Sequence, residues 1–387
     1  MRLFAFLLCF VVNPALTQAQ SSVVLPFFNL TNNPENNWIG ESFSESLAAS
    51  LAEQDLLVVE RADREQIYQR LAIKRYALLT RASVLKIAMS LDAFSAVYGQ
   101  IEPAGQAGND LKITAFVVNS RKLASLGEFT VTGPISNLSS MQSQLSWQVL
   151  RTLKQPLSLP ESEYTASHPA IHVDALKNQV AGLLAKDDPQ KLRFFVQATR
   201  IDPRYSAPAF ELGKLYFRKK QWQESALWMS RLDGSSNHFR EATFYLGIAR
   251  YNLNDFDAAE RAFAQVAETV PLNEVLNNLA AAQSRLKQEA ALENFKKALN
   301  GAEADPAYQF NVGYALLKSG DPSAAAERFR AVLDRNPNDA QATEFLGMSL
   351  KGLPTEQIPE GAERLKTTYP ENIFLQIKAI LQPRKSN

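Results

Sequence analysis

Five two-residue signals recur along the carboxyl-terminal half of this chain, and their nearly constant spacing constrains its fold more than any other feature. They are Leu212-Gly213, Leu246-Gly247, Leu279-Ala280, Val312-Gly313 and Leu346-Gly347. Subtracting the residue numbers of their first members gives steps of 34, 33, 33 and 34. A fixed period of this size is typical of repeat proteins, in which each unit buries its apolar face against its neighbours.

More small and apolar residues fall where a second helix of each unit would lie. One unit has Ala259, Phe263 and Val266 before Pro271, and a later one has Ala325, Phe329 and Val332 before Pro337. Small residues let two helices approach closely, a buried Phe fills the gap between them, and Pro cannot continue a helix. The pattern resembles the tetratricopeptide repeat, a pair of antiparallel helices of about 34 residues. It predicts about six repeats over residues 171–371.

The last of these repeats is the least regular. Leu346-Gly347 opens it and Pro370 closes it, but Pro354 and Pro359 fall near its second helix. Residues 372–387 are expected to form a capping helix and a tail, since a solenoid needs a terminal element with a polar outer face.

The amino-terminal residues 1–19 are predicted to be a signal peptide. Arg2 precedes an apolar run from Leu3 to Val12, and Thr17-Gln18-Ala19 resembles a cleavage site. The run is too short to span a bilayer, and no later segment approaches eighteen apolar residues, so no transmembrane helix is expected. The alternatives are a retained anchor and a lipoprotein. The second would lipidate Cys9, the only cysteine, but the bulky Leu7-Leu8 before it disfavour that reading.

Residues 20–155 show a mixed pattern of strands and helices and are predicted to form an α+β domain. Strands are expected near residues 23–27, 56–59, 93–101, 111–118 and 126–131, with a hairpin turn at Ser120-Arg121-Lys122. Helices are expected over 39–52, 64–71, 82–91 and 141–153. Residues 156–170 are rich in Pro, Ser, Thr and Glu and are predicted to be a linker.

The residues of this first domain show a second resemblance. Val24-Leu25-Pro26-Phe27-Phe28-Asn29-Leu30, then a helix, then Val58-Val59-Glu60-Arg61, are similar to the amino-terminal domain of TolB. Related domains occur in the curli-secretion lipoprotein CsgG and the flagellar outer-membrane protein FlgO. The resemblance implies a TolB-like fold and a role in the bacterial envelope. It implies no pore, because neither membrane-inserting hairpins nor a lipidated cysteine is evident.

The sequence offers little for catalysis or cofactor binding, and neither a cofactor nor a metal is expected. The formal net charge of +1 gives no general basic field for nucleic acid. His168 and His172 lie four residues apart, but they are interpreted as surface residues. Ser83-Val84-Leu85-Lys86 and Ser284-Arg285-Leu286-Lys287 match the Ser-x-x-Lys spacing of penicillin-binding enzymes, whose companion motifs are missing. Asp187, Asp255 and Asp321 are interpreted as favouring helix N-termini.

The inner wall of the repeat array is the candidate site for a partner. It is expected to come from the first helix of each pair, where aromatic residues and scattered cations gather. Half of these aromatics could instead pack between repeats. The candidate partner-binding residues are Phe210, Lys214, Phe217, Arg218, Phe244, Tyr251, Asn277, Phe310, Tyr314 and Lys318, with Ile248 and Met348 beside them.

These observations favour an exported protein of the bacterial envelope, periplasmic or associated with the outer membrane, that binds a protein or peptide without catalysis. A structural component of a secretion or flagellar assembly, similar to CsgG or FlgO, is the alternative. An enzyme is the least favoured class. The identity of the partner and the oligomeric state cannot be predicted from the sequence.

Overall fold

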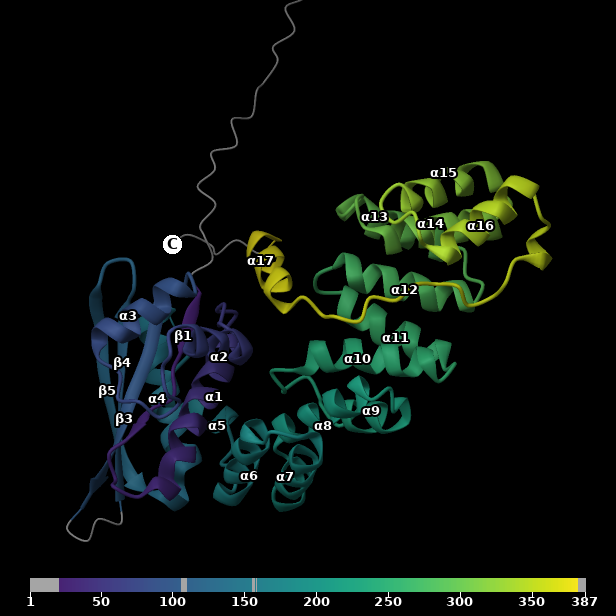
Figure 1. Cartoon of the computed structure of the whole chain (residues 1–387). Coiled ribbons are helices and arrows are strands. Elements are labelled where there is room, and N and C mark those ends of the chain that lie inside the picture. The colour runs from purple at the N-terminus through teal and green to yellow at the C-terminus, as the bar shows by residue number, and fades with distance from the viewer. Residues whose placement is uncertain (1–20, 106–109, 155–156, 158, 382–387) are drawn as a thin grey trace, which may run out of the picture. The chain divides into compact units, whose positions relative to one another are not determined.

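The computed structural model describes residues 21–105, 110–154, 157 and 159–381. The predicted signal peptide and the last six residues lie outside this range. The chain divides into two compact units between Pro169 and Ala170, and each is described by itself (Figure 1). None of the helices in the described ranges is both long and apolar enough to cross a membrane.

The first unit is built on a mixed sheet. Its strands are β1 (Ser22–Val24), β2 (Phe28–Asn29), β3 (Ser95–Ala104), β4 (Asp110–Asn119) and β5 (Ala124–Pro134). Both β1 and β2 pair in parallel with β3, whereas β3, β4 and β5 are antiparallel. The β4–β5 pair is the hairpin that the sequence predicted, with a register shift between Val117 and Val118.

Five helices accompany this sheet: α1 (Asn37–Glu53), α2 (Arg61–Arg70), α3 (Arg81–Ser90), α4 (Leu138–Leu153) and α5 (Glu161–Ser167). Helices α1 and α4 pack on each other and on the sheet. Helices α2 and α3 share a core with Val23, Ala96 and Val118, which lie side by side in register on one face. The α+β class expected for this region is therefore confirmed.

Two expectations for this unit were wrong in detail. The strand expected at 56–59 is reduced to one parallel bridge between Ser22 and Val58. The stretch expected to be a linker contains helix α5, whose Tyr164 is completely buried. Composition did not reveal α5 because its single apolar anchor stands among Ser, Thr and Glu.

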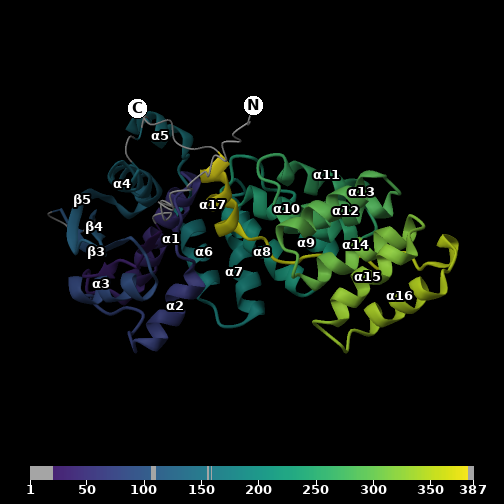
Figure 2. The same cartoon turned by 90° about the horizontal axis from the view of Figure 1, so that it is seen from above.

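The second unit consists of helices. They are α6 (Val173–Leu184), α7 (Asp188–Ile201), α8 (Ser206–Arg218), α9 (Trp222–Met229), α10 (Phe239–Asn252), α11 (Phe256–Ala267), α12 (Asn273–Arg285), α13 (Ala290–Gly301), α14 (Pro306–Lys318), α15 (Pro322–Leu333), α16 (Ala340–Lys351) and α17 (Glu371–Leu381). Helices α6 to α15 form five successive pairs, and Figure 2 shows these helices following one another along the array. The predicted helical solenoid is confirmed.

The residues that carry the repeat pattern pack as their chemistry predicts. Phe263, Phe295 and Phe329 are completely buried. A Cβ atom added to Gly247 would lie 2.6 Å from the ring of Phe263, so only glycine allows this approach. Asp187, Asp255 and Asp321 accept hydrogen bonds from backbone N–H groups at the starts of α7, α11 and α15, as expected.

The sixth pair lacks the second helix that the spacing predicted. Residues 353–370 are all described, and they contain a single 3₁₀ turn (Thr355–Gln357) and no α-helix. Pro354 and Pro359 cannot donate backbone hydrogen bonds, and Gly361 adopts a left-handed φ of 77°. A Cβ atom at Gly347, the equivalent of Gly247, would meet nothing within 4 Å, because no second helix packs against α16 there.

Candidate functional site

The chain segment that replaces the missing helix lies along the first helices of the array. We call residues 358–370 the strap, and we call the side chains of α10, α12, α14 and α16 that contact it, together with the helix-capping Asp305 and Asp339, the trough. In Figures 1 and 2 the strap runs from the α16 end of the array past α12 and leads into α17. Its buried anchors are Ile358, Ala362 and Tyr369.

Two asparagines hold the strap by its backbone. Asn311 of α14 donates from Nδ2 to the carbonyl of Arg364 at 2.9 Å, and its Oδ1 accepts from the N–H of Arg364 at 2.8 Å. Asn278 of α12 makes the same pair of bonds with Lys366, both at 2.8 Å. Because the N–H and C=O of residues i and i+2 of an extended chain point to the same side, this arrangement recognises an extended backbone of any sequence.

A third asparagine fixes the first. Asn277 donates to the Arg364 carbonyl at 2.9 Å, and its Oδ1 accepts from Asn311 at 2.7 Å. All three asparagines are completely buried. Buried amides without partners would cost about 1–3 kcal/mol each, so these side chains require a backbone opposite them.

The side chain of Arg364 lies in an acidic and aromatic pocket. Its two terminal nitrogens contact the two carboxylate oxygens of Asp339 at 2.7 and 2.8 Å, and its Nε donates to Gln341 at 3.1 Å. The guanidinium carbon lies 3.7 Å from the ring centroid of Phe310. The hydrogen bonds from Arg364 lower the pKa of Asp339 below its ordinary value. The pocket therefore fits a bidentate, planar cation.

Lys366 occupies an equivalent place one repeat earlier. Its ammonium pairs with Asp305 and lies 4.6 Å from the ring centroid of Tyr308. Asp305 and Asp339 are 34 residues apart, and both also cap their helices, α14 and α16. The trough thus presents one carboxylate per repeat, together with two aromatic rings of α14, to alternate residues of the strap.

The opposite side of the strap is acidic. Glu363 accepts hydrogen bonds from the Tyr251 hydroxyl at 3.0 Å and from the Ser284 hydroxyl at 2.6 Å. Burial raises the pKa of Tyr251, and the neighbouring Glu363 raises it further. Tyr251 therefore stays a neutral donor. Leu365, between the two cations, packs into the core formed by α12, α13 and α14.

Both ends of the strap are also attached to the array. At its start the Tyr314 hydroxyl donates to the Pro359 carbonyl at 2.9 Å, and Lys318 pairs with Glu360 at 2.8 Å. At its end the ring of Tyr369 lies 5.5 Å from that of Phe244. Beyond the strap, Arg240 pairs with Glu371 of α17 at 2.7 Å.

The structure divides the ten predicted partner-binding residues into two groups. Six of them contact the strap or its side chains: Phe244, Tyr251, Asn277, Phe310, Tyr314 and Lys318. The other four lie on α8: Phe210 stacks on His238, Lys214 pairs with Glu241, Phe217 contacts Trp222 and Tyr245, and Arg218 pairs with Asp188.

The sequence interpretation missed the residues that hold the backbone and the cations, chiefly Asn278, Asn311, Asp305 and Asp339. A signal for them exists. Asn277 and Asn311 are one period of 34 apart, as are Asp305 and Asp339. Comparing equivalent repeat positions for polar residues, rather than for aromatics, would have found them.

Other candidate sites in the described residues have structural roles. Ser83 shares in the cap of α3 with Thr80, and Ser284 binds the strap, so neither Ser-x-x-Lys match forms a Ser–Lys pair in the contacts observed. His168 pairs with Glu53 and His172 contacts the first turn of α6. No cluster of three or more His, Cys, Asp or Glu suited to a metal occurs in the described part of the chain.

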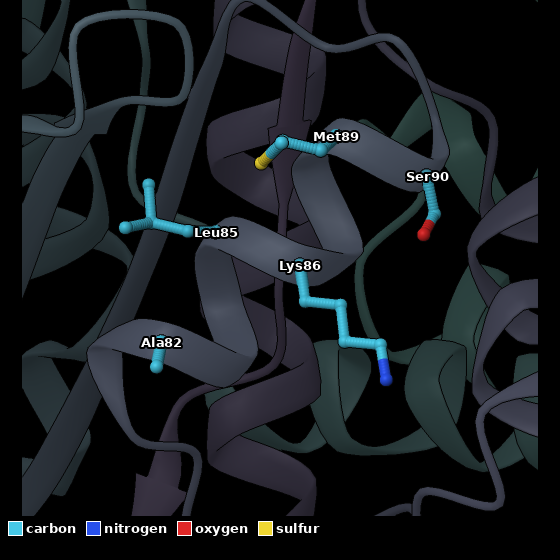
Figure 3. Close-up of a pocket in the computed structure, with 5 residues that line it drawn as sticks. All are labelled: Ala82, Leu85, Lys86, Met89 and Ser90. Carbon is cyan, nitrogen blue, oxygen red and sulfur yellow. The ribbon is translucent and has the colours of Figure 1, made fainter.

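A shallow hollow on α3 is lined by Ala82, Leu85, Lys86, Met89 and Ser90 (Figure 3). Met89 is 63% exposed there, so the hollow is an open apolar surface rather than an enclosed pocket. It contains no pair of groups placed for acid–base or nucleophilic chemistry.

Comparison with known proteins supports the repeat assignment. Residues 310–372 match the tetratricopeptide repeat family. No curated protein matches the chain. Similar solved structures include YrrB, described as a tetratricopeptide repeat protein with an unusual peptide-binding site (18% identity, 49% of this chain and 93% of that one, TM-score 0.36). MamA (16%, 41% and 99%, 0.36) and the carboxyl-terminal domain of LpoB from Salmonella enterica (17%, 30% and 83%, 0.26) are others. The matched family segment ends two residues beyond the strap.

Proposed function

We propose that this protein is a non-catalytic interaction protein of the bacterial envelope that binds an extended segment of a partner protein along the inner face of its repeat array. The observation that carries this proposal is the trough itself. Its asparagines, aromatic rings and carboxylates already hold the backbone and the cationic side chains of Arg364 and Lys366, which is the chemistry that a peptide ligand requires.

The envelope setting is supported by the sequence of residues 1–19, which has the features of a cleaved signal peptide, and by the resemblance of residues 20–155 to the amino-terminal domain of TolB. The first unit would then act in localisation or assembly, and the array would supply partner binding. Peripheral association with the outer membrane is compatible with this division of roles.

Photocrosslinking in living cells tests this function. A photoreactive phenylalanine replaces Phe217, which lies on α8 among the four predicted residues away from the strap. The matched control replaces Lys297, which is 55% exposed on α13, a second helix. We expect a defined envelope protein to be crosslinked from position 217 and not from 297. Equal labelling from both positions, or none from 217, would contradict a partner site on the inner face.

A further inference from the structure

The contacts of the strap define a ligand more narrowly than the fold does. Backbone recognition by Asn278 and Asn311 requires an extended segment, and the two carboxylates require cations at alternate positions. Leu365 is partly buried against the core of α12, α13 and α14, which favours an apolar residue between the two cations. The segment that satisfies all three conditions has the pattern Arg-apolar-Lys.

We propose that the trough is a binding site for a partner segment of the form Arg-apolar-Lys, and that the strap is a built-in competitor that occupies this site until the partner displaces it. This inference rests on the proposed function and names the ligand class of that site. The trough can bind the strap and an external peptide through the same contacts. Each bond to the strap goes to its backbone or to side chains that an external peptide can also supply.

The strap has the properties of a displaceable ligand. Its side chains at Arg364 and Lys366 remain about a quarter exposed, with 22% and 25% of their side-chain surface accessible. Its backbone is held by asparagine side chains rather than by a helix or sheet ladder. Ion pairs between partly exposed groups contribute little net stability, so a competing segment can exchange with these two.

A displaced strap would expose its apolar side chains, and the uncovered face of α16 offers them another surface to pack on. No second helix covers α16, whose Leu350 is 63% exposed and whose Gly347 faces open space. A displaced strap can pack there, which lowers the cost of leaving the trough.

Peptide binding to the exported chain, residues 20–387, tests the proposal. The probe is a fluorescent peptide with the sequence of residues 358–370, followed by anisotropy. The strap variant R364E/K366E places two acidic side chains against Asp305 and Asp339 and should empty the trough. We expect it to bind the peptide at least tenfold more tightly than the wild type. The control variant K296E/K297E on α13 makes the same change in net charge and should behave as the wild type.

A second peptide, with Arg and Lys both replaced by Glu, tests whether the carboxylates of Asp305 and Asp339 select a cationic segment. It should not bind R364E/K366E. Equal binding of both peptides, or a folded R364E/K366E that binds the residue 358–370 peptide no better than the wild type, would overturn the proposal. A wild-type dimer abolished by R364E/K366E in light scattering would also overturn it, because a second copy would then be the occupant.

Hydrogen exchange of the wild-type chain keeps the proposal testable if R364E/K366E does not fold. The amides of Arg364 and Lys366 should exchange at least tenfold faster than the hydrogen-bonded amides of α12 and α14. Exchange as slow as that of the helices would make the strap an integral part of the core and overturn the proposal. Neither negative result changes the crosslinking expected at Phe217. Failure of the peptide or exchange experiment would therefore reject the proposed ligand, whereas failure of crosslinking would reject the proposed function.

Discussion

His168 shows how a single side chain can make the stability of the first unit depend on pH. Its Nε2 lies 2.8 Å from Glu53 Oε2, its Nδ1 lies 2.7 Å from the Tyr164 carbonyl, and its ring stacks on Tyr164. The hydrogen bond to Glu53 raises the pKa of His168. Because the folded pKa is raised, the stabilisation is fully present below the unfolded pKa of about 6.5 and is lost as the pH rises through the folded value.

The substitution H168Q should therefore lower stability at pH 6 by up to about 1 kcal/mol and should have a smaller effect at pH 8. Urea unfolding at the two pH values measures the difference. H172Q is the matched control, since the His172 side chain is exposed and contacts Asp174 in the first turn of α6. A wild-type chain and an H168Q variant with parallel pH profiles would show that this pair does not contribute.

A side chain's role could be predicted from the sequence when it had a single role, and was missed when it had two. The caps at Asp187 and Asp321 serve only their own helices in the contacts observed, and they were predicted. Asp305 and Asp339 have two, since each caps a helix and also binds a cation of the strap. The capping role explains their presence fully, so the sequence marks their second role only by the 34-residue spacing that they share.

At the scale of helices, two glycines at the same repeat position have opposite surroundings. Gly247 faces the ring of Phe263, and its added Cβ would lie 2.6 Å away, whereas Gly347 faces open space. We expect G247A to destabilise the array by about 1–3 kcal/mol through overpacking. G347A should stabilise it by about 0.5–1 kcal/mol, because alanine favours a helix interior over glycine.

Thermal and urea unfolding of the two variants measure these changes, and each variant serves as the other's control. Destabilisation by G347A similar to that by G247A would mean that a second helix covers α16 in solution. The strap would then be in another conformation.

A buried ion pair between helices α1 and α2 allows a second prediction about how packed helices depend on single side chains. Glu41 is completely buried and lies 3.3 Å from Arg64, which is 3% exposed and also donates to the Val24 carbonyl and to Ser44. Burial raises the pKa of Glu41, and the arginines oppose this shift. R64M should cost about 3–5 kcal/mol, because it removes one of the two arginines, Arg61 and Arg64, that pair with a buried carboxylate.

R75M is the matched control for R64M. Arg75 pairs with Glu65 at 3.0 Å but is 40% exposed, so its loss should cost less than about 1 kcal/mol. Urea unfolding of both variants gives the comparison. A loss of stability in R64M no larger than in R75M would show that the carboxylate is already neutral at that pH.

The helices that the sequence predicted best are those whose period, glycine and phenylalanine agree. The strap was predicted as a helix from the spacing between Leu346-Gly347 and Pro370. Its residues Ala362-Glu363-Arg364-Leu365-Lys366 also have the residue types of Ala326-Glu327-Arg328-Phe329-Arg330 in α15. Local sequence does not decide between the two structures, because the trough supplies an alternative set of partners for the same side chains. Pro354 and Pro359 were the only local signs of this competition.

At the scale of the molecule, this duplicated pattern predicts where a displaced strap goes. When a peptide with the Arg-apolar-Lys pattern fills the trough, residues 362–370 should pack as the second helix of the sixth pair, with Leu365 against Gly347 as Phe329 lies against Gly313. The double variant G347C/L365C detects this state. The chain from residue 20 onward has no native cysteine, so a disulfide can form only between the two introduced thiols. Such a bond requires Cα atoms about 4.4–6.8 Å apart.

We expect G347C/L365C to form the disulfide slowly alone and at least tenfold faster with the residue 358–370 peptide present, as measured by mass spectrometry under mild oxidation. G347C/T367C is the matched control. Two positions along a helix turn a side chain by about 200°, so position 367 would face away from Gly347 in a helix. Equal rates for both pairs would indicate an unstructured strap. No acceleration of G347C/L365C under conditions where the peptide binds would mean that the strap leaves the trough without completing the array.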